Sequence, residues 1–289
     1  MCTDTAAVSE KRGKEARRVA FLGELLNILD ADMTTPTMYG WFHLLFFALS
    51  IAAGVLLCKY KKPTDKFVND LMLFTAILSI VLEVYKQINY TFSYDGSVIT
   101  GDYQWYAFPF QFCSTPMYVG LLAGILRKGK IRDALCTYLA TYALFGGLVV
   151  MIYPAQVFIS TIGINIQTMI CHGSMLTVGI YLLGTRYIKL EHKTVLKAIP
   201  VFVCLVAAAT VMNEIAYFTG LLERETFNMF FISRHCEGTL PVYSIVQGFV
   251  PYPWCMIIYV VIFTLAAYIM VLLAMLIKKL ATKKVPANA

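Results

Sequence analysis

The stretch from Pro253 to Ile277, PWCMIIYVVIFTLAAYIMVLLAMLI, contains no charged residue and decides the fold class. A helix rises about 1.5 Å per residue, so this run is long enough to cross a hydrocarbon core of about 30 Å. The whole chain of 289 residues has the same character, because 59% of its residues are hydrophobic and only 14% are charged. Soluble domains carry about 25% charged residues. We therefore expect the chain to lie in a bilayer.

Several further apolar runs of spanning length separate the charged clusters of the sequence. Together with the first they predict an all-α membrane protein, a bundle of about seven transmembrane helices. The predicted spans are Met38–Cys58, Phe67–Tyr85, Ala107–Leu126, Ile131–Tyr153, Ile159–Leu183, Val195–Phe218 and Pro253–Ile277.

The basic residues predict the orientation of this bundle. Lysines and arginines gather in the connections 59–66, 127–132 and 186–197 and directly after the last span. The positive-inside rule assigns these regions and the C-terminus to the cytoplasm, and an odd number of spans then puts the N-terminus outside. Because the net charge of +7 is spread over span ends and forms no single basic face, we expect no nucleic-acid partner.

We divide the chain into a polar N-terminal segment (1–37), a transmembrane bundle (38–278) and a basic cytoplasmic tail (279–289). Within the first segment, Val19–Leu29 has the apolar spacing of a short amphipathic helix that can lie on a membrane surface. The first twenty residues are polar and contain no cleavable signal peptide. The C-terminal KKVPANA contains no recognisable retrieval signal, so we expect the plasma membrane as the location.

Polar residues recur at helical spacing within the spans, which marks the faces that point into protein. Three stripes are evident: Thr75, Ser79, Glu83 and Lys86; Thr161, Asn165, Thr168 and His172; and Thr210, Asn213, Glu214 and Tyr217. In the third predicted span, Cys113 aligns with Gly120 and Gly124, a spacing of small residues that lets a neighbouring helix approach closely. We therefore expect Cys113 to face protein.

Four of these polar residues lie at one predicted depth. At about 1.5 Å per residue, Cys113 is about 21 Å from Arg127, and His172 is about 21 Å from Arg186. Asn213 lies about 24 Å from Lys197, and Glu83 about 25 Å from Lys66, by the same rise. The sequence thus predicts a polar layer in the outer half of the membrane, where a lipid ester could reach it.

A thiol and an imidazole at the same depth can carry out nucleophilic acyl chemistry, because the imidazole can take the proton of the thiol. We assign Cys113 and His172 as the candidate catalytic pair. Gln111 and Asn213 could orient the imidazole or stabilise an oxyanion, and Glu83 and Glu214 complete the supporting polar layer. This chemistry needs no cofactor and no metal.

Three other interpretations remain open at this point. Cys113 could be a small packing residue, as buried cysteines often are, and the chain could then be a scaffold whose polar stripes only join helices. Alternatively, a polytopic transporter or ligand-binding protein could use a midplane polar site made of Glu83, His172, Asn213 and Glu214. Glu83 and Lys86 could also form a simple i,i+3 ion pair.

Four motifs occur in a specific order along the chain. They are PFQFCS around Cys113, ICHG around His172, NEIAYFTG from Asn213, and FNMFFISRHCEGTLPVYSIVQGFVPYPW from Phe227 to Trp254. In these motifs the sequence resembles the YwaF-like integral membrane protein family, which includes a eukaryotic branch of transmembrane phospholipid acyltransferases. The resemblance implies a multi-helix membrane fold in which Cys113 and His172 move fatty acyl chains between phospholipids. Membrane lipids are accordingly the expected substrates.

Overall fold

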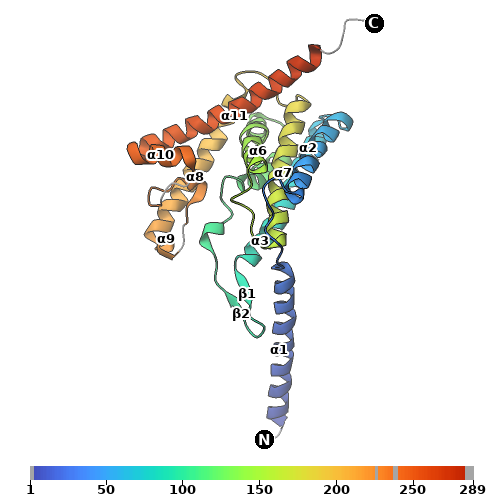
Figure 1. Cartoon of the computed structure of the whole chain (residues 1–289), viewed down its shortest axis with the longest axis vertical. Coiled ribbons are helices and arrows are strands. Elements are labelled where there is room, and N and C mark those ends of the chain that lie inside the picture. The colour runs from blue at the N-terminus through green and yellow to red at the C-terminus, as the bar shows by residue number, and fades with distance from the viewer. Residues whose placement is uncertain (1–2, 225–226, 237–239, 284–289) are drawn as a thin grey trace.

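The computed structural model describes residues 3–224, 227–236 and 240–283, and it is mostly helical (Figure 1). The chain begins with α1 (Thr3–Leu29), α2 (Trp41–Tyr60) and α3 (Asp65–Asn89), followed by a hairpin of β1 (Phe92–Tyr94) and β2 (Ile99–Gly101). The next elements are η1 (Trp105–Ala107), α4 (Thr115–Ile125), α5 (Lys130–Tyr138), the π-helical turn η2 (Leu139–Ala143), α6 (Leu144–Ile152) and α7 (Ile162–Gly184). The last are η3 (Thr194–Lys197), α8 (Ile199–Phe218), α9 (Leu221–Arg224), η4 (Met229–Phe231), α10 (Pro241–Phe249) and α11 (Tyr252–Lys283).

Within the described residues, 6 helices are long and apolar enough to cross a membrane. They are α2, α3, the continuous α5–η2–α6 helix, α7, α8 and α11, and they correspond to six of the seven predicted spans. The predicted span Ala107–Leu126 is the exception. Its helix, α4, covers only Thr115–Ile125, which is 11 residues or about 16 Å, too short for a hydrocarbon core of about 30 Å.

The shortening of this span has a local cause. Pro116 lies in the first turn of α4, where its missing N–H costs no hydrogen bond. The segment before it, residues 108–114, is irregular and folds back on the protein. Cys113 therefore lies in a turn before α4, and the predicted helical face shared with Gly120 and Gly124 does not exist.

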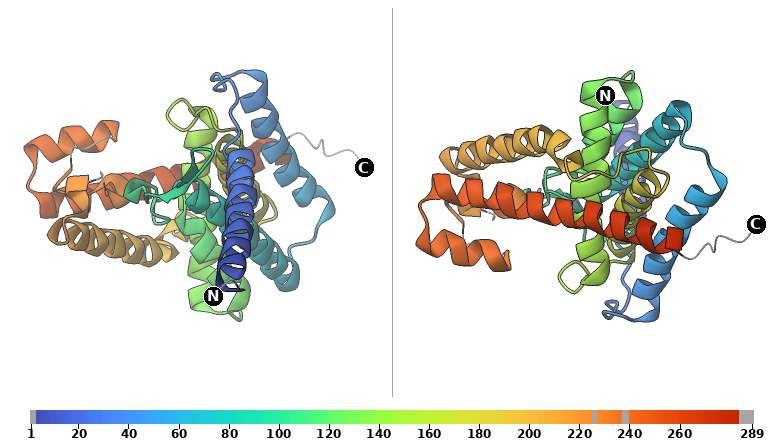
Figure 2. Two further views of the ribbon diagram at one scale, coloured as in Figure 1. Left: turned by 90° about the horizontal axis from the view of Figure 1, so that it is seen from below. Right: turned by 90° about the horizontal axis from the view of Figure 1, so that it is seen from above.

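Two helices form the centre of the bundle. In the most apolar windows of α5–η2–α6 and α7, 67% of the residues are buried, against 28% or less in the other spans. Viewed along the long axis, α8 and α10 lie on one side of these helices and α2 and α3 lie on the other, while α11 begins on the α8 side and crosses the centre (Figure 2). The helix α1 projects from one end of the bundle beside the hairpin, and its role at a membrane surface stays a prediction (Figure 1).

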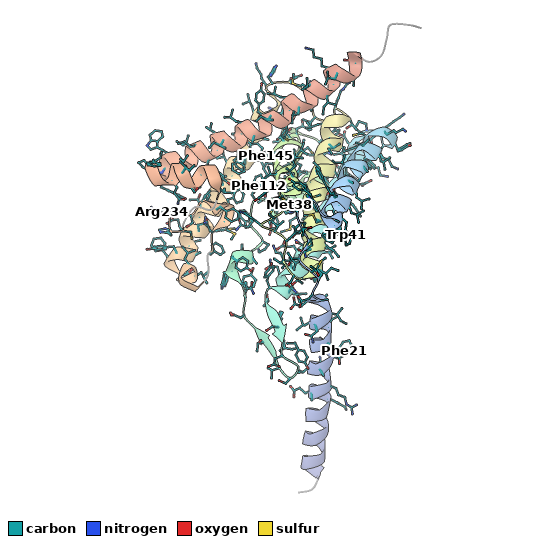
Figure 3. All side chains as sticks on the ribbon, viewed as in Figure 1. Phe21, Met38, Trp41, Phe112, Phe145 and Arg234 are labelled. Atoms are coloured by element: carbon teal, nitrogen blue, oxygen red, sulfur yellow. The ribbon has the colours of Figure 1, made fainter. Side chains whose placement is uncertain are left out.

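Aromatic rings join the α8–α11 side to the centre. The ring of Phe202 in α8 stacks on Tyr142 at a centroid distance of 4.5 Å and on Tyr259 of α11 at 6.1 Å. Phe112 and Phe145 also contact Phe263 of α11 (Figure 3). Helices in lipid are not driven together by the hydrophobic effect, because lipid tails are equally apolar. Packed rings of this kind supply the contacts that hold them together.

Glycines bring α6 and α7 close together. A Cβ atom on Gly147 of α6 would lie 2.8 Å from the backbone oxygen of His172, a contact that no side-chain rotation can relieve. A Cβ on Gly54 of α2 would lie 2.9 Å from the side chain of Ile180 in α7. Small residues thus fix the position of α7, which carries His172.

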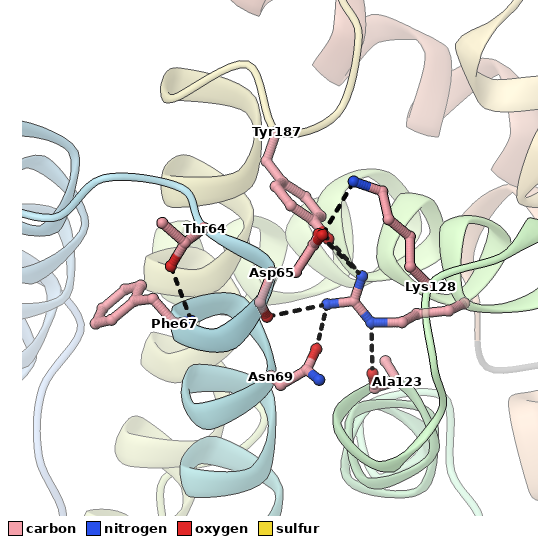
Figure 4. Close-up of polar contacts among 8 residues, drawn as sticks. Thr64, Asp65, Phe67, Asn69, Ala123, Lys128 and Tyr187 are labelled. Atoms are coloured by element: carbon pink, nitrogen blue, oxygen red, sulfur yellow. Dashed lines mark hydrogen bonds and ion pairs between the residues drawn. The ribbon is translucent and has the colours of Figure 1, made fainter.

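The basic connections between spans meet at one end of the molecule through Arg132, whose side chain is buried (Figure 4). Its guanidinium donates to the Ala123 carbonyl at 3.1 Å, to the side chain of Asn69 and to the hydroxyl of Tyr187. Asp65 accepts from Tyr187 at 2.7 Å and pairs with Lys128 at 3.0 Å. Burial of Tyr187 and its hydrogen bond to Asp65 raise the pKa of its hydroxyl to about 12. Arg132 therefore joins α3, α4 and the α7–η3 connection, while the orientation of this end stays a prediction.

Replacing Arg132 by Met should destabilise the fold by about 3 kcal/mol, because a buried network loses its central donor. The matched control is Arg127→Met, since Arg127 is exposed. Thermal unfolding of the purified protein in detergent measures the difference. A Tm for Arg132→Met equal to that of the control would contradict this structural role.

Gly147→Ala should destabilise the protein by about 1–3 kcal/mol, because the added methyl group forces α6 away from α7. Gly248→Ala in α10 is the control, since a Cβ there meets nothing within 4 Å. The same thermal unfolding experiment compares them, and equal Tm values would refute the close approach of α6 and α7.

Candidate functional site

Cys113 lies in a turn that is held at both ends. The N–H groups of Ser114 and Thr115 donate to the carbonyl of Gln111 at 2.9 and 3.2 Å. The Thr115 hydroxyl donates to the carbonyl of Phe112 at 2.8 Å and shares a second hydrogen bond of 2.8 Å with the buried hydroxyl of Tyr138. Cys113 precedes the N-cap of α4, Ser114, by one residue. The partial positive charge of a helix N-terminus favours a thiolate at such a position.

His172 is buried in α7 and has a fixed tautomer. Its Nδ1 lies 2.8 Å from the backbone oxygen of Thr168, one turn earlier. A carbonyl only accepts hydrogen bonds, so Nδ1 carries the proton and Nε2 of the neutral ring keeps its lone pair. The side chains of His172 and Cys113 interact with each other and line the same cavity. The imidazole can therefore accept the proton of the thiol.

The two groups line one cavity of about 150 Å³ between α3, the Cys113 turn and α7. Its polar lining is dense for the interior of a membrane bundle. The polar and thiol-bearing residues are Ser79, Glu83, Lys86, Cys113, Ser114, Gln167, Thr168, Cys171 and His172.

Glu83 and Lys86 form the i,i+3 ion pair that their spacing suggested. The Lys86 Nζ atom is 2.7 Å from Glu83 Oε1, and their side chains are only 17% and 9% exposed. The amide of Gln87 also donates to Glu83 at 2.6 Å. The pair places a cation and an anion in the wall of the cavity, so the site keeps a positive charge near Cys113 without a buried unpaired ion.

The amides of Gln111 and Asn213 both form hydrogen bonds with a different segment, the backbone around η4, which we call the η4 loop. The amide of Gln111 donates to the carbonyl of Asn228 and accepts from the N–H of Phe230, both at 3.0 Å. The amide of Asn213 donates to the carbonyl of Met229 at 3.0 Å and accepts from its N–H at 2.7 Å. Both amides are therefore engaged with backbone, and neither lines the cavity with His172.

These amides stabilise a strained backbone that packs beside Cys113. Phe230 and Phe231 have φ angles of 59° and 57°, which cost about 1–2 kcal/mol for each such residue. The ring of Phe230 lies 5.8 Å from that of Phe112, next to Cys113 in sequence. Gln111 and Asn213 thus act on the Cys113 turn indirectly, through the loop that supports it.

Glu214 lies apart from the cavity, on the α8 side. Its carboxylate accepts from Arg234 at 2.8 and 3.0 Å and lies 3.2 Å from His235, whose ring stacks on Tyr217. Of the predicted supporting layer, only Glu83 shares the cavity with Cys113 and His172. The four residues of the alternative midplane site likewise do not line one cavity.

Sequence reasoning missed Gln167 and Cys171 as members of the site. Gln167 donates to the sulfur of Cys171 at 3.6 Å. The two residues are four apart in α7, one position before the stripe that ends at Thr168 and His172, and this i,i+4 spacing was the available signal. Within residues 3–224, 227–236 and 240–283, no group of three or more His, Cys, Asp or Glu side chains could hold a metal ion.

Comparison with known proteins gives one match. A model of the TMEM164 family matches residues 36–271, which include both Cys113 and His172 and begin after α1. No curated protein and no solved structure matches the chain. Since the family model covers most of its length, the chain belongs to the TMEM164 family, a family of transmembrane proteins.

Proposed function

We propose that this protein is a membrane-embedded enzyme that transfers acyl chains between lipid esters, with Cys113 as nucleophile and His172 as general base and acid. One observation carries the proposal. A thiol and an imidazole with a fixed tautomer meet in a polar cavity inside an otherwise apolar bundle. Ionisable groups inside a membrane are costly, so their convergence is a mark of function.

In the first half of the reaction, Nε2 of His172 takes the thiol proton and the sulfur of Cys113 attacks the carbonyl carbon of a lipid ester. A carbon–sulfur bond forms and the carbonyl oxygen becomes negative. The C–O bond to the glycerol oxygen then breaks, and His172 returns the proton to that leaving oxygen. The products are a thioester on Cys113 and a lysophospholipid.

In the second half, the hydroxyl of another lysophospholipid gives its proton to Nε2 and attacks the thioester carbon. A new C–O bond forms, the carbon–sulfur bond breaks, and the proton returns from His172 to the sulfur. Water in place of the acceptor hydroxyl would make the same protein a hydrolase. Exclusion of bulk water by the surrounding helices favours transfer.

Two sources of positive charge support the oxyanion in both halves. The N-terminus of α4 follows Cys113, and the Lys86 ammonium lines the same cavity. Fixed charges and dipoles in a water-poor site stabilise developing negative charge more strongly than they would in water. The pairing with Glu83 keeps Lys86 in place in the resting enzyme.

The resemblance of PFQFCS and ICHG to the motifs of transmembrane phospholipid acyltransferases supports the same assignment. Substrates are then membrane phospholipids and lysophospholipids, and the proposed location is the plasma membrane. A transporter built on Glu83, His172, Asn213 and Glu214 receives less support, because Asn213 and Glu214 lie outside the cavity that contains the other two.

Trapping the acyl-enzyme tests the proposal. The purified protein in phospholipid nanodiscs receives a phospholipid with a labelled acyl chain, and acid quenching preserves the thioester. Cys113→Ser should abolish hydroxylamine-labile label, and His172→Ala should slow its formation by about 100-fold or more, the usual contribution of a general base.

Cys204→Ser is the matched control, since Cys204 is exposed on α8 and lies outside the cavity. It should leave the label unchanged. Label that persists in Cys113→Ser would refute the proposal, provided that thermal unfolding shows each variant to be folded.

A further inference from the structure

The polar cavity is the end of a row of three spaces that run along α3. It shares Ser79, Pro116 and Met175 with a small space of about 20 Å³. That space shares Thr75 and Ser174 with a large groove of about 790 Å³ between α2, α3 and α7. We call this small space the neck, because it lies between the polar cavity and the groove.

The polar stripe that was predicted in α3 lines all three spaces. Glu83 and Lys86 lie in the cavity wall, Ser79 lies between the cavity and the neck, and Thr75 lies between the neck and the groove. Both Thr75 hydroxyl contacts are with carbonyls of its own helix, at 2.9 and 3.2 Å. Polarity therefore falls along α3 from Glu83 to Thr75.

The groove itself is apolar. Its volume of about 790 Å³ lies within the range of roughly 300–1,000 Å³ that is usual for ligand pockets. Hydrocarbon side chains make up most of its wall, including Phe46, Leu49, Leu56, Leu71, Phe74 and Leu78. A groove with such a wall in a bilayer can accept a hydrocarbon chain.

We propose that this groove holds the acyl chain of the donor lipid, with the ester of that lipid at Cys113; the proposal rests on the acyl-transfer function above. The cavity of about 150 Å³ can hold the reacting ester but not a whole lipid. The chain must therefore leave the cavity, and the apolar groove is reached from it through the neck. The ester and its charged neighbours then lie at the polar end of the row, and the methyl end of the chain lies at the apolar end.

The neck determines how the chain enters. A space of about 20 Å³ has room for about one water molecule but not for a hydrocarbon chain, so side chains must move before a chain passes. Met175 lines both the cavity and the neck and is buried. Its unbranched side chain has several rotatable bonds and adapts readily to a new shape. Rotation of Met175 is the movement that opens the neck.

Binding in the groove orients the ester and does not depend on the hydrophobic effect, because lipid tails outside are as apolar as the groove. Blocking the groove should therefore slow the reaction of long chains by displacing their ester from Cys113. A misplacement of about 1 Å can cost up to about 100-fold in rate.

The experiment compares Ala53→Trp with Ala52→Trp in the nanodisc assay of thioester formation. Ala53 lines the groove, whereas its neighbour Ala52 is exposed and does not. The donors are two phospholipids that differ only in the labelled chain, hexadecanoyl or hexanoyl. Ala53→Trp should react about tenfold or more slowly with the hexadecanoyl donor and at nearly the normal rate with the hexanoyl donor, whose chain is too short to fill the groove. Ala52→Trp should behave as the unmodified protein with both.

Two results would overturn the proposal. Equal rates for Ala53→Trp and Ala52→Trp with both donors would mean that no reacting chain occupies the groove. An equal loss for Ala53→Trp with both donors would mean that the substitution damages the fold or removes a protein partner, not a chain.

A second measurement separates this proposal from the acyl-transfer function. A phospholipid with a diazirine at the end of its acyl chain is photo-crosslinked to protein that carries Cys113→Ser, and the labelled peptides are identified by mass spectrometry. The groove peptides of α2 and α3 should be labelled less with Ala53→Trp than with Ala52→Trp. If thioester trapping fails but this difference persists, the chemistry is refuted and the groove still binds chains. If trapping succeeds and the difference is absent, only the groove is refuted.

Discussion

Backbone that is not helical can exist at membrane depth only if protein groups satisfy its hydrogen bonds, because lipid offers none. This bundle has two irregular segments, the Cys113 turn and the η4 loop, and hydrogen bonds between them satisfy part of this requirement. Gln111, in the first segment, supplies hydrogen bonds to Asn228 and Phe230 in the second. Asn213 supplies the remaining pair to Met229. The position of Cys113 depends on this mutual support.

The irregular turn places Cys113 near positive charge that a continuous helix would not provide. At the centre of a spanning helix the dipoles of both ends are far away, whereas Cys113 lies directly before the N-terminus of the short α4. The positive end of α4 and the cation of Lys86 then lie near the sulfur. Both effects stabilise the charged thiolate, whereas burial in an apolar interior destabilises it.

Close helix packing fixes the other half of the pair. Gly147 lets α6 reach the backbone of α7 at His172, and Gly54 lets α2 approach α7 at Ile180. The imidazole is also fixed by its hydrogen bond to Thr168 within α7. The rigid central helices therefore hold His172, and the turn supported by the η4 loop holds Cys113. Space remains on the α2 and α3 side, where the apolar groove lies.

The sequence by itself determined the membrane class and six of the spans, and it selected Cys113 and His172 as the candidate pair. These follow from local properties, namely the length of apolar runs and the 3.6-residue period of polar stripes. Only the tertiary structure decided that α4 is short, that Gln111 and Asn213 bind the η4 loop, and that Glu214 pairs with Arg234. Side chains that are predicted at the same depth can still point in different directions around the bundle. Which polar groups meet depends on helix rotation and on contacts between residues far apart in the chain, and a periodic pattern carries no record of either.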